Sequence, residues 1–142
     1  MKYSPFKLHK YFISIYQSIL SVPYYGQVEQ NREFKSLKIL LDNYDSDLIL
    51  FAIPKYIAQF KEKSTIVGFS NLEFFVRKYK PYSNVVKFYK NIFELNTKKR
   101  QTVLDLLEEY EDYLEAIILS GDEIRRKKEI IEELDKIYVT EN

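Results

Sequence analysis

The chain has 142 residues, of which 46% are hydrophobic and 30% are charged, and its 22 Lys and Arg nearly balance 21 Asp and Glu. This composition is typical of one globular domain, and it contains no apolar run long enough to span a bilayer. The absence of cysteine excludes disulfides, thiolate metal sites and cysteine nucleophiles. The first residues, MKYSPFKLHKYF, lack the apolar core of a signal peptide, so we expect a cytoplasmic protein with no membrane partner.

Charge and aromatic residues divide the chain. Residues 1–100 hold 17 Lys and Arg against 8 Asp and Glu, a net charge of +9, whereas residues 101–142 hold 5 against 13, a net charge of −8. Of the 23 Tyr and Phe residues, 20 lie at or before Phe93. We therefore expect a basic, aromatic-rich helical body over 1–96 and an acidic helical hairpin over 97–142. Such charge asymmetry indicates that the basic body binds a polyanion or that the two parts pair with each other. Most of the aromatic side chains are expected to belong to the core.

The first helix is marked by Ser4, a candidate N-cap, followed by Pro5 at the first helical position. The pattern predicts a helix to about Val22 and a polar link over 27–33. Its expected buried face is Phe6, Tyr11 or Phe12, Ile15, Ile19 and Leu20.

The stretch from Phe34 to Phe60 has the densest apolar periodicity and predicts two core helices joined by an acidic turn. Phe34, Leu37, Leu41 and Tyr44 form the first apolar face; Leu48, Ala52, Tyr56 and Phe60 form the second. The cluster Asp42, Asp45 and Asp47 favours helix capping over cation binding, because it lacks the EF-hand spacing. Pro54 predicts a kink or break near Leu50 to Pro54, since proline cannot donate to the carbonyl four residues earlier.

Two shorter helices are expected after a loop over 61–69. Ser70 and Glu73 have capping-box spacing, and the helix that they open would bury Leu72, Phe75, Val76 and Tyr79. After Pro81, a helix is expected over 84–95, with Lys87 and Lys90 outward and with Val85, Val86, Tyr89, Ile92 and Phe93 inward.

The tail predicts a hairpin that begins at Asn96 or Thr97 and turns at Gly121, with Asp122 capping the second arm. Arg125 to Lys128 would then lie near Asp112 and Glu115, which indicates ion pairing within the hairpin. The rival interpretation is a partner-binding or oligomerising seam made of Leu106, Tyr110, Tyr113, Ile117, Ile124, Ile131 and Leu134.

Catalysis is not expected. His9 is the sole histidine, and we expect it to have a surface or half-buried structural role. The three glycines are isolated, so neither a phosphate loop nor a dinucleotide fingerprint is present. We expect no cofactor and no metal site.

The main binding feature is a set of cations on the predicted outer faces of successive helices. Such a set can follow a phosphate backbone and release its counterions, although each residue alone also fits an ordinary solvated surface. The expected nucleic-acid-binding residues are Lys35, Lys38, Arg77, Lys78, Lys80, Lys87, Lys90, Lys98, Lys99 and Arg100.

A resemblance supports this class of function. FKSLKILLDNYDSDLILFAI, the later Tyr56 and FSNLEFF resemble a helical segment of small phage and plasmid replication proteins of the helicase-loader and DnaD-like type. The resemblance covers about 40 residues and implies a module that binds DNA or docks on a replicative helicase.

Together these observations predict an all-α protein, a compact bundle of about five helices followed by a C-terminal hairpin. We expect a non-catalytic, nucleic-acid-associated accessory protein with DNA and a helicase or a second copy as partners. Two alternatives stay open: a protein assembly module, which includes an oligomeric viral protein, and an inhibitor whose acidic surface over 108–115 mimics DNA.

Overall fold

The structure, a computed structural model, describes residues 3–22, 30–61 and 72–140. In these ranges the chain is helical and has no strand, which confirms the all-α class. The chain divides into unit 1, Met1–Phe93, and unit 2, Glu94–Asn142. No helix within the described ranges is both long enough and apolar enough to cross a membrane. The helices are α1 (Pro5–Leu20), α2 (Gln30–Asn43), α3 (Ser46–Ala58), α4 (Leu72–Lys78), α5 (Val86–Asn91), the 3-10 helix η2 (Ile92–Glu94), α6 (Thr97–Glu115) and α7 (Gly121–Thr140).

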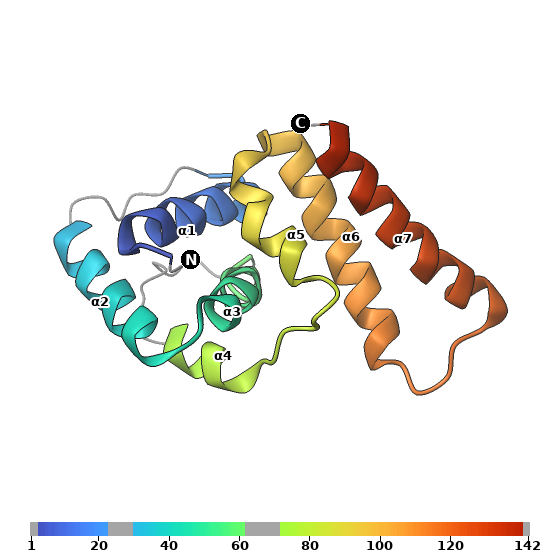
Figure 1. Ribbon diagram of the computed structural model, residues 1–142, viewed down its shortest axis with the longest axis horizontal. Helices are drawn as coiled ribbons and strands as arrows, with labels where there is room; N and C mark the ends of the chain where they lie inside the picture. Colours follow the sequence, from blue (N-terminus) through green and yellow to red (C-terminus); the bar gives the residue numbers. More distant parts are fainter. Residues whose placement is uncertain (1–2, 23–29, 62–71, 141–142) are drawn as a thin grey trace. The chain divides into compact units, whose positions relative to one another are not determined.

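Unit 1 is built around α3, which contacts α1, α2, α4 and α5 (Figure 1). The side chains from Ile49 to Pro54 are buried without interruption, and Tyr56 and Ile57 extend this buried run. A helix that is apolar on all sides must be covered on all sides. The prediction that the stretch from Phe34 to Phe60 holds the core is therefore confirmed for its second half.

Pro54 lies inside α3, and of the predicted kink or break the break is absent, because the helix continues through the proline. Proline has no N–H group, so the carbonyl of Leu50 loses its usual helical donor. The hydroxyl of Tyr11 on α1 replaces that donor through a buried hydrogen bond of 2.8 Å to the Leu50 oxygen. A tertiary contact thus satisfies a polar group that would otherwise be buried without a partner.

α1 begins as predicted, because the Ser4 hydroxyl accepts a hydrogen bond from the Lys7 amide at 3.0 Å. The helix ends at Leu20 rather than Val22, with Ser21 in the left-handed conformation. The assignment of Phe6 to the buried face was wrong, since 56% of this residue is exposed. Tyr11, Phe12 and Ile15 are buried as expected, whereas Ile19 and Leu20 are half-buried.

α2 begins at Gln30, so the expected polar link extends too far, and residues 23–29 lie outside the described ranges. Leu37 is buried, but Leu40 rather than Leu41 or Tyr44 is the second buried residue of this helix. Glu33 is also buried, and its Oε2 lies 3.1 Å from Nε2 of His9. His9 is only 4% exposed, so it is fully buried and not on the surface or half-buried as we expected.

α4 and α5 both pack on α3. α4 buries Leu72 and Val76, while Phe75 and Tyr79 are half-buried. Ser70 and nearly all of the expected loop lie outside the described residues. The predicted helix over 84–95 is split into α5 and η2. Lys87 and Lys90 are exposed as predicted, and the buried apolar residues of this segment are Val85, Phe88, Tyr89, Ile92 and Leu95.

Unit 2 is a helical hairpin, as predicted, in which α6 contacts α7 (Figure 1). Asn96 caps α6 through a 2.9 Å hydrogen bond from the Lys99 amide. The turn differs from the prediction, because α6 ends at Glu115 and Gly121 is already the first residue of α7. Ser120 and Glu123 form a reciprocal capping box, and an N-cap serine requires a non-helical backbone. The chain must therefore leave the helix before Ser120.

Replacing Tyr11 with phenylalanine is expected to lower the free energy of unfolding by about 1–3 kcal/mol, because it leaves the Leu50 carbonyl buried without its donor. In a Pro54→Ala background the same replacement is expected to cost less, since the backbone amide that alanine restores at position 54 can donate to Leu50. Urea unfolding of the four chains measures this coupling, with Tyr79→Phe as the control for removing a tyrosine hydroxyl. Equal costs in the two backgrounds would contradict the compensation.

Candidate nucleic-acid interface and hairpin surface

The outer side of α4 brings together an aromatic ring and several cations. Leu72 and Val76 are spaced four residues apart and are buried. Phe74 lies midway between them, about 200° around the helix from each, and is 62% exposed. Arg77, Lys78 and Lys80 are also exposed. We call Phe74, Arg77, Lys78, Tyr79 and Lys80 the α4 surface.

Cations and rings are in contact on this surface. The Lys78 ammonium lies 6.0 Å from the Phe74 ring centroid and 5.4 Å from that of Tyr79. Lys55 of α3 approaches the Tyr79 ring to 5.7 Å, and Phe75 stacks on it at 5.8 Å. Arg77 forms an exposed contact of 3.4 Å with Glu73. Such exposed pairs contribute about 0–1 kcal/mol, so a polyanion can displace this one at little cost.

Phe74 was not among the binding residues predicted from the sequence, although its spacing from Leu72 and Val76 indicates that it is exposed. An aromatic residue two positions from each of two core residues on a helix must lie on the opposite face. The position of Phe74 between Leu72 and Val76 therefore predicts exposure once the buried face of α4 is known. Exposed large aromatic residues next to cations are typical of surfaces that stack and neutralise single-stranded nucleic acid.

The remaining predicted cations are spread over other elements. Lys35 and Lys38 are exposed on α2, and Lys87 and Lys90 are exposed on α5. Lys90 pairs with Asp47 at 3.2 Å, and the Lys87 ammonium lies 5.0 Å from the Phe88 ring centroid. In unit 2, Lys98 is exposed and Lys99 is half-buried.

Arg100 does not fit the role predicted for it. It is 8% exposed, and its Nη2 donates a 2.8 Å hydrogen bond to the carbonyl of Leu95. Burial lowers the pKa of this guanidinium, because the charged form loses solvation. The first turn of α6 places Arg100 inward because it lies on the same face as Val103 and Leu107. It is therefore removed from the candidate interface.

The predicted partner-binding seam is largely buried in the described structure. Leu106, Tyr110 and Leu134 are 7% exposed or less, so they belong to the core and not to a free surface. Tyr113 and Ile131 are half-buried, and on α7 the buried apolar pair is Ile130 with Leu134, one residue away from the predicted Ile131. Only Ile117 and Ile124, which are 99% and 48% exposed, remain accessible.

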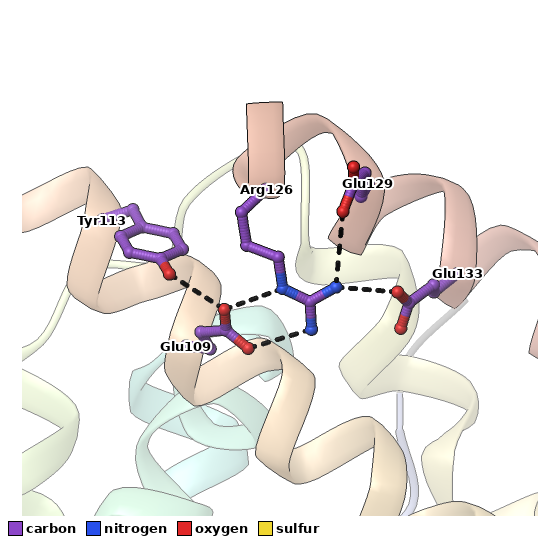
Figure 2. A network of polar contacts seen from close by, with 5 residues as sticks. All are labelled: Glu109, Tyr113, Arg126, Glu129 and Glu133. Atoms are coloured by element: carbon purple, nitrogen blue, oxygen red, sulfur yellow. Dashed lines mark hydrogen bonds and ion pairs between the residues drawn. The ribbon is translucent and has the colours of Figure 1, made fainter. Parts of the chain in front are cut away.

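Arg126 links the two arms of the hairpin (Figure 2). Its Nε and Nη2 donate to the two carboxylate oxygens of Glu109 on α6 at 2.9 and 3.1 Å. Its Nη1 donates to Glu133 at 2.8 Å and lies 3.8 Å from Glu129. Pairing of the basic cluster within the hairpin is thus confirmed for Arg126, but the acidic partner across the hairpin is Glu109 and not the expected Asp112 or Glu115. The bidentate geometry fixes the orientation of the guanidinium relative to the Glu109 carboxylate.

This network shifts the pKa values of Glu109, Tyr113 and Arg126. The hydrogen bonds from Arg126 hold the pKa of Glu109 below its ordinary value, and those to Glu109 and Glu133 raise the pKa of Arg126. The Tyr113 hydroxyl donates to Glu109 at 2.9 Å, which raises the pKa of that tyrosine. All three shifts favour an ionised Glu109 between a charged Arg126 and a protonated Tyr113 hydroxyl, which are the groups joined by dashed lines in Figure 2.

Within the part of the chain that the structure describes, no group of three or more acidic or histidine side chains is arranged to hold a metal ion. Asp45 instead caps α3, accepting a hydrogen bond from the Asp47 amide at 3.2 Å, as the sequence predicted. Comparison of the chain with protein-family models, with curated proteins and with solved structures gives no match. The candidate interface is therefore argued from its own residues.

Replacing Glu109 with glutamine is expected to lower the free energy of unfolding near pH 7 by about 1 kcal/mol, because the side chains involved are one-third exposed. A carboxyl whose folded pKa is lowered stabilises the fold above its unfolded pKa, and this contribution is lost as the pH falls through the folded pKa. Urea unfolding near pH 7 and near pH 3, with exposed Glu132→Gln as the control, should show a smaller cost in acid. An equal cost at both pH values would assign the effect to packing and not to charge.

Proposed function

We propose that the protein is a nucleic-acid-associated accessory protein that acts without catalysis, and that unit 1 binds single-stranded nucleic acid on the α4 surface. One observation carries this proposal: an aromatic side chain that is 62% exposed lies on the same short helix as two exposed cations, Arg77 and Lys78, and a third exposed cation, Lys80, follows two residues after the helix ends. The cations supply attraction for phosphates, and the ring supplies a face on which a base can stack.

Single strands fit this surface better than a duplex does. Bases of a duplex present only their edges, whereas an unpaired base can lie flat on Phe74. α4 has only seven residues and is anchored through Leu72 and Val76, so its outer side is convex and narrow. We infer binding that follows the backbone charge and depends little on base sequence.

The other exposed cations extend the proposed path within unit 1. Lys87 and Lys90 belong to α5, which packs on the same central helix as α4. Lys90 already contacts Asp47, so its contribution is smaller than that of an unpaired cation. The resemblance to phage and plasmid replication proteins supports a role in DNA replication as the setting of this function.

Replacing Phe74 with alanine is expected to weaken binding of a labelled single-stranded oligonucleotide by about 5- to 150-fold, equivalent to the loss of one stacked base at about 1–3 kcal/mol. Fluorescence anisotropy at low salt measures the affinity. Because Phe74 is exposed, the fold should be unchanged, and exposed Ile39 on α2, replaced with alanine, is the matched control. Equal affinities for the two variants would contradict stacking on Phe74.

The cations are tested separately through salt dependence. For single strands, each phosphate neutralised adds about 0.7 to the slope of log affinity against log salt concentration. Neutralising Arg77, Lys78 and Lys80 with glutamine should therefore reduce the slope by about 2, while Lys35→Gln with Lys38→Gln should change it less. A wild-type chain that binds neither DNA nor RNA single strands at low salt would refute the proposed function.

A further inference from the structure

The connection between the two helices of the hairpin exposes large aliphatic side chains to solvent. Residues 116–120 connect α6 to α7, and Ile117 and Ile118 in this connection are 99% and 85% exposed. Ile124, in the first turn of α7, is 48% exposed. Adjacent exposed isoleucines cost solvation free energy and are typical of a contact surface. We call Ile117, Ile118 and Ile124 the hairpin tip.

The charge around the hairpin tip restricts what can cover it. Residues 108–124 contain seven carboxylates and no Lys or Arg, and the four cations that follow at 125–128 leave a net charge of −3 over 108–128. Asp112 and Asp122 are exposed, and the contact of Asp122 with Arg125 joins side chains that are 92% and 73% exposed. Such a contact neutralises little. An occupant must therefore offer an apolar group surrounded by positive charge.

The chain itself carries a surface with that chemistry. On the α4 surface, Phe74 is exposed next to Arg77 and Lys78, and residues 74–80 contain no acidic residue. Two hairpin tips placed together would bring like carboxylates into contact, and two α4 surfaces would bring cations together. Electrostatics therefore favours tip against α4 over either symmetric pairing.

We propose that the hairpin tip of one chain docks on the α4 surface of a second copy of this chain. Each chain has one tip and one α4 surface, so the contact is head-to-tail and can extend to further copies. It buries a few side chains on each side, so the association is weak and falls as salt rises. The proposal shares the α4 surface with the proposed function but needs no nucleic acid.

Light scattering and sedimentation velocity of the full chain test this proposal in the absence of nucleic acid. Between about 1 and about 200 µM, the range suited to a small transient interface, the average mass is expected to rise with concentration and to fall with added salt. Two double variants, Ile117→Ser with Ile118→Ser and Arg77→Glu with Lys78→Glu, should each remain monomeric. Their equimolar mixture should regain association but stop at dimers, because each variant retains one intact surface.

Matched controls keep the result specific. Val139→Ser removes a 70% exposed aliphatic side chain away from the tip, and Lys35→Glu with Lys38→Glu reverses charge on α2; both should associate as the wild type does. Circular dichroism confirms that every variant is folded. A wild-type chain that is monomeric throughout, a tip variant or an α4 variant that still associates alone, or a mixture that stays monomeric would each overturn the proposal.

Discussion

The hydrogen bond from the Tyr11 hydroxyl to the Leu50 carbonyl lets α3 be both the core of unit 1 and a helix that contains proline. α3 is buried nearly all round, so no water is at hand for the carbonyl that Pro54 leaves without a donor. A partner had to come from a neighbouring helix, and α1 provides it at 2.8 Å. This requirement fixes α1 against α3, and the other helices of unit 1 cover the sides of α3 that remain.

A central helix that is mostly buried leaves most of the surface chemistry to the helices that cover it. In α4, for example, Leu72 and Val76 are buried in the core, whereas Phe74 is exposed to solvent. In the hairpin, Ile130 and Leu134 are buried, and Arg126 joins α7 to Glu109 of α6, whereas Ile117 and Ile118 contribute nothing to helix pairing. Both proposals rest on exposed side chains that do not pack in the core, namely Phe74, Ile117 and Ile118.

The α4 surface and the hairpin tip belong to units of opposite net charge. Unit 1 holds 14 Lys and Arg against 7 Asp and Glu, and residues 94–142 hold 8 against 14. A basic, aromatic surface attracts either a polynucleotide or an acidic, aliphatic protein segment through the same two forces. Under the two proposals, nucleic acid and the hairpin tip of another copy compete for the α4 surface, so each lowers the apparent affinity of the other.

Local sequence determined the helical class, the hairpin and the caps at Ser4, Asp45 and Asn96, because periodicity and capping act within a few residues. The capping-box spacing of Ser120 and Glu123 is also visible in the sequence. The prediction placed the turn at Gly121 instead, and this position was wrong. Only tertiary structure decided that Tyr11 compensates Pro54, that Arg100 and His9 are buried, and that Phe6 is exposed. A helical repeat defines relative faces, but which face becomes the interior depends on partners distant in the chain.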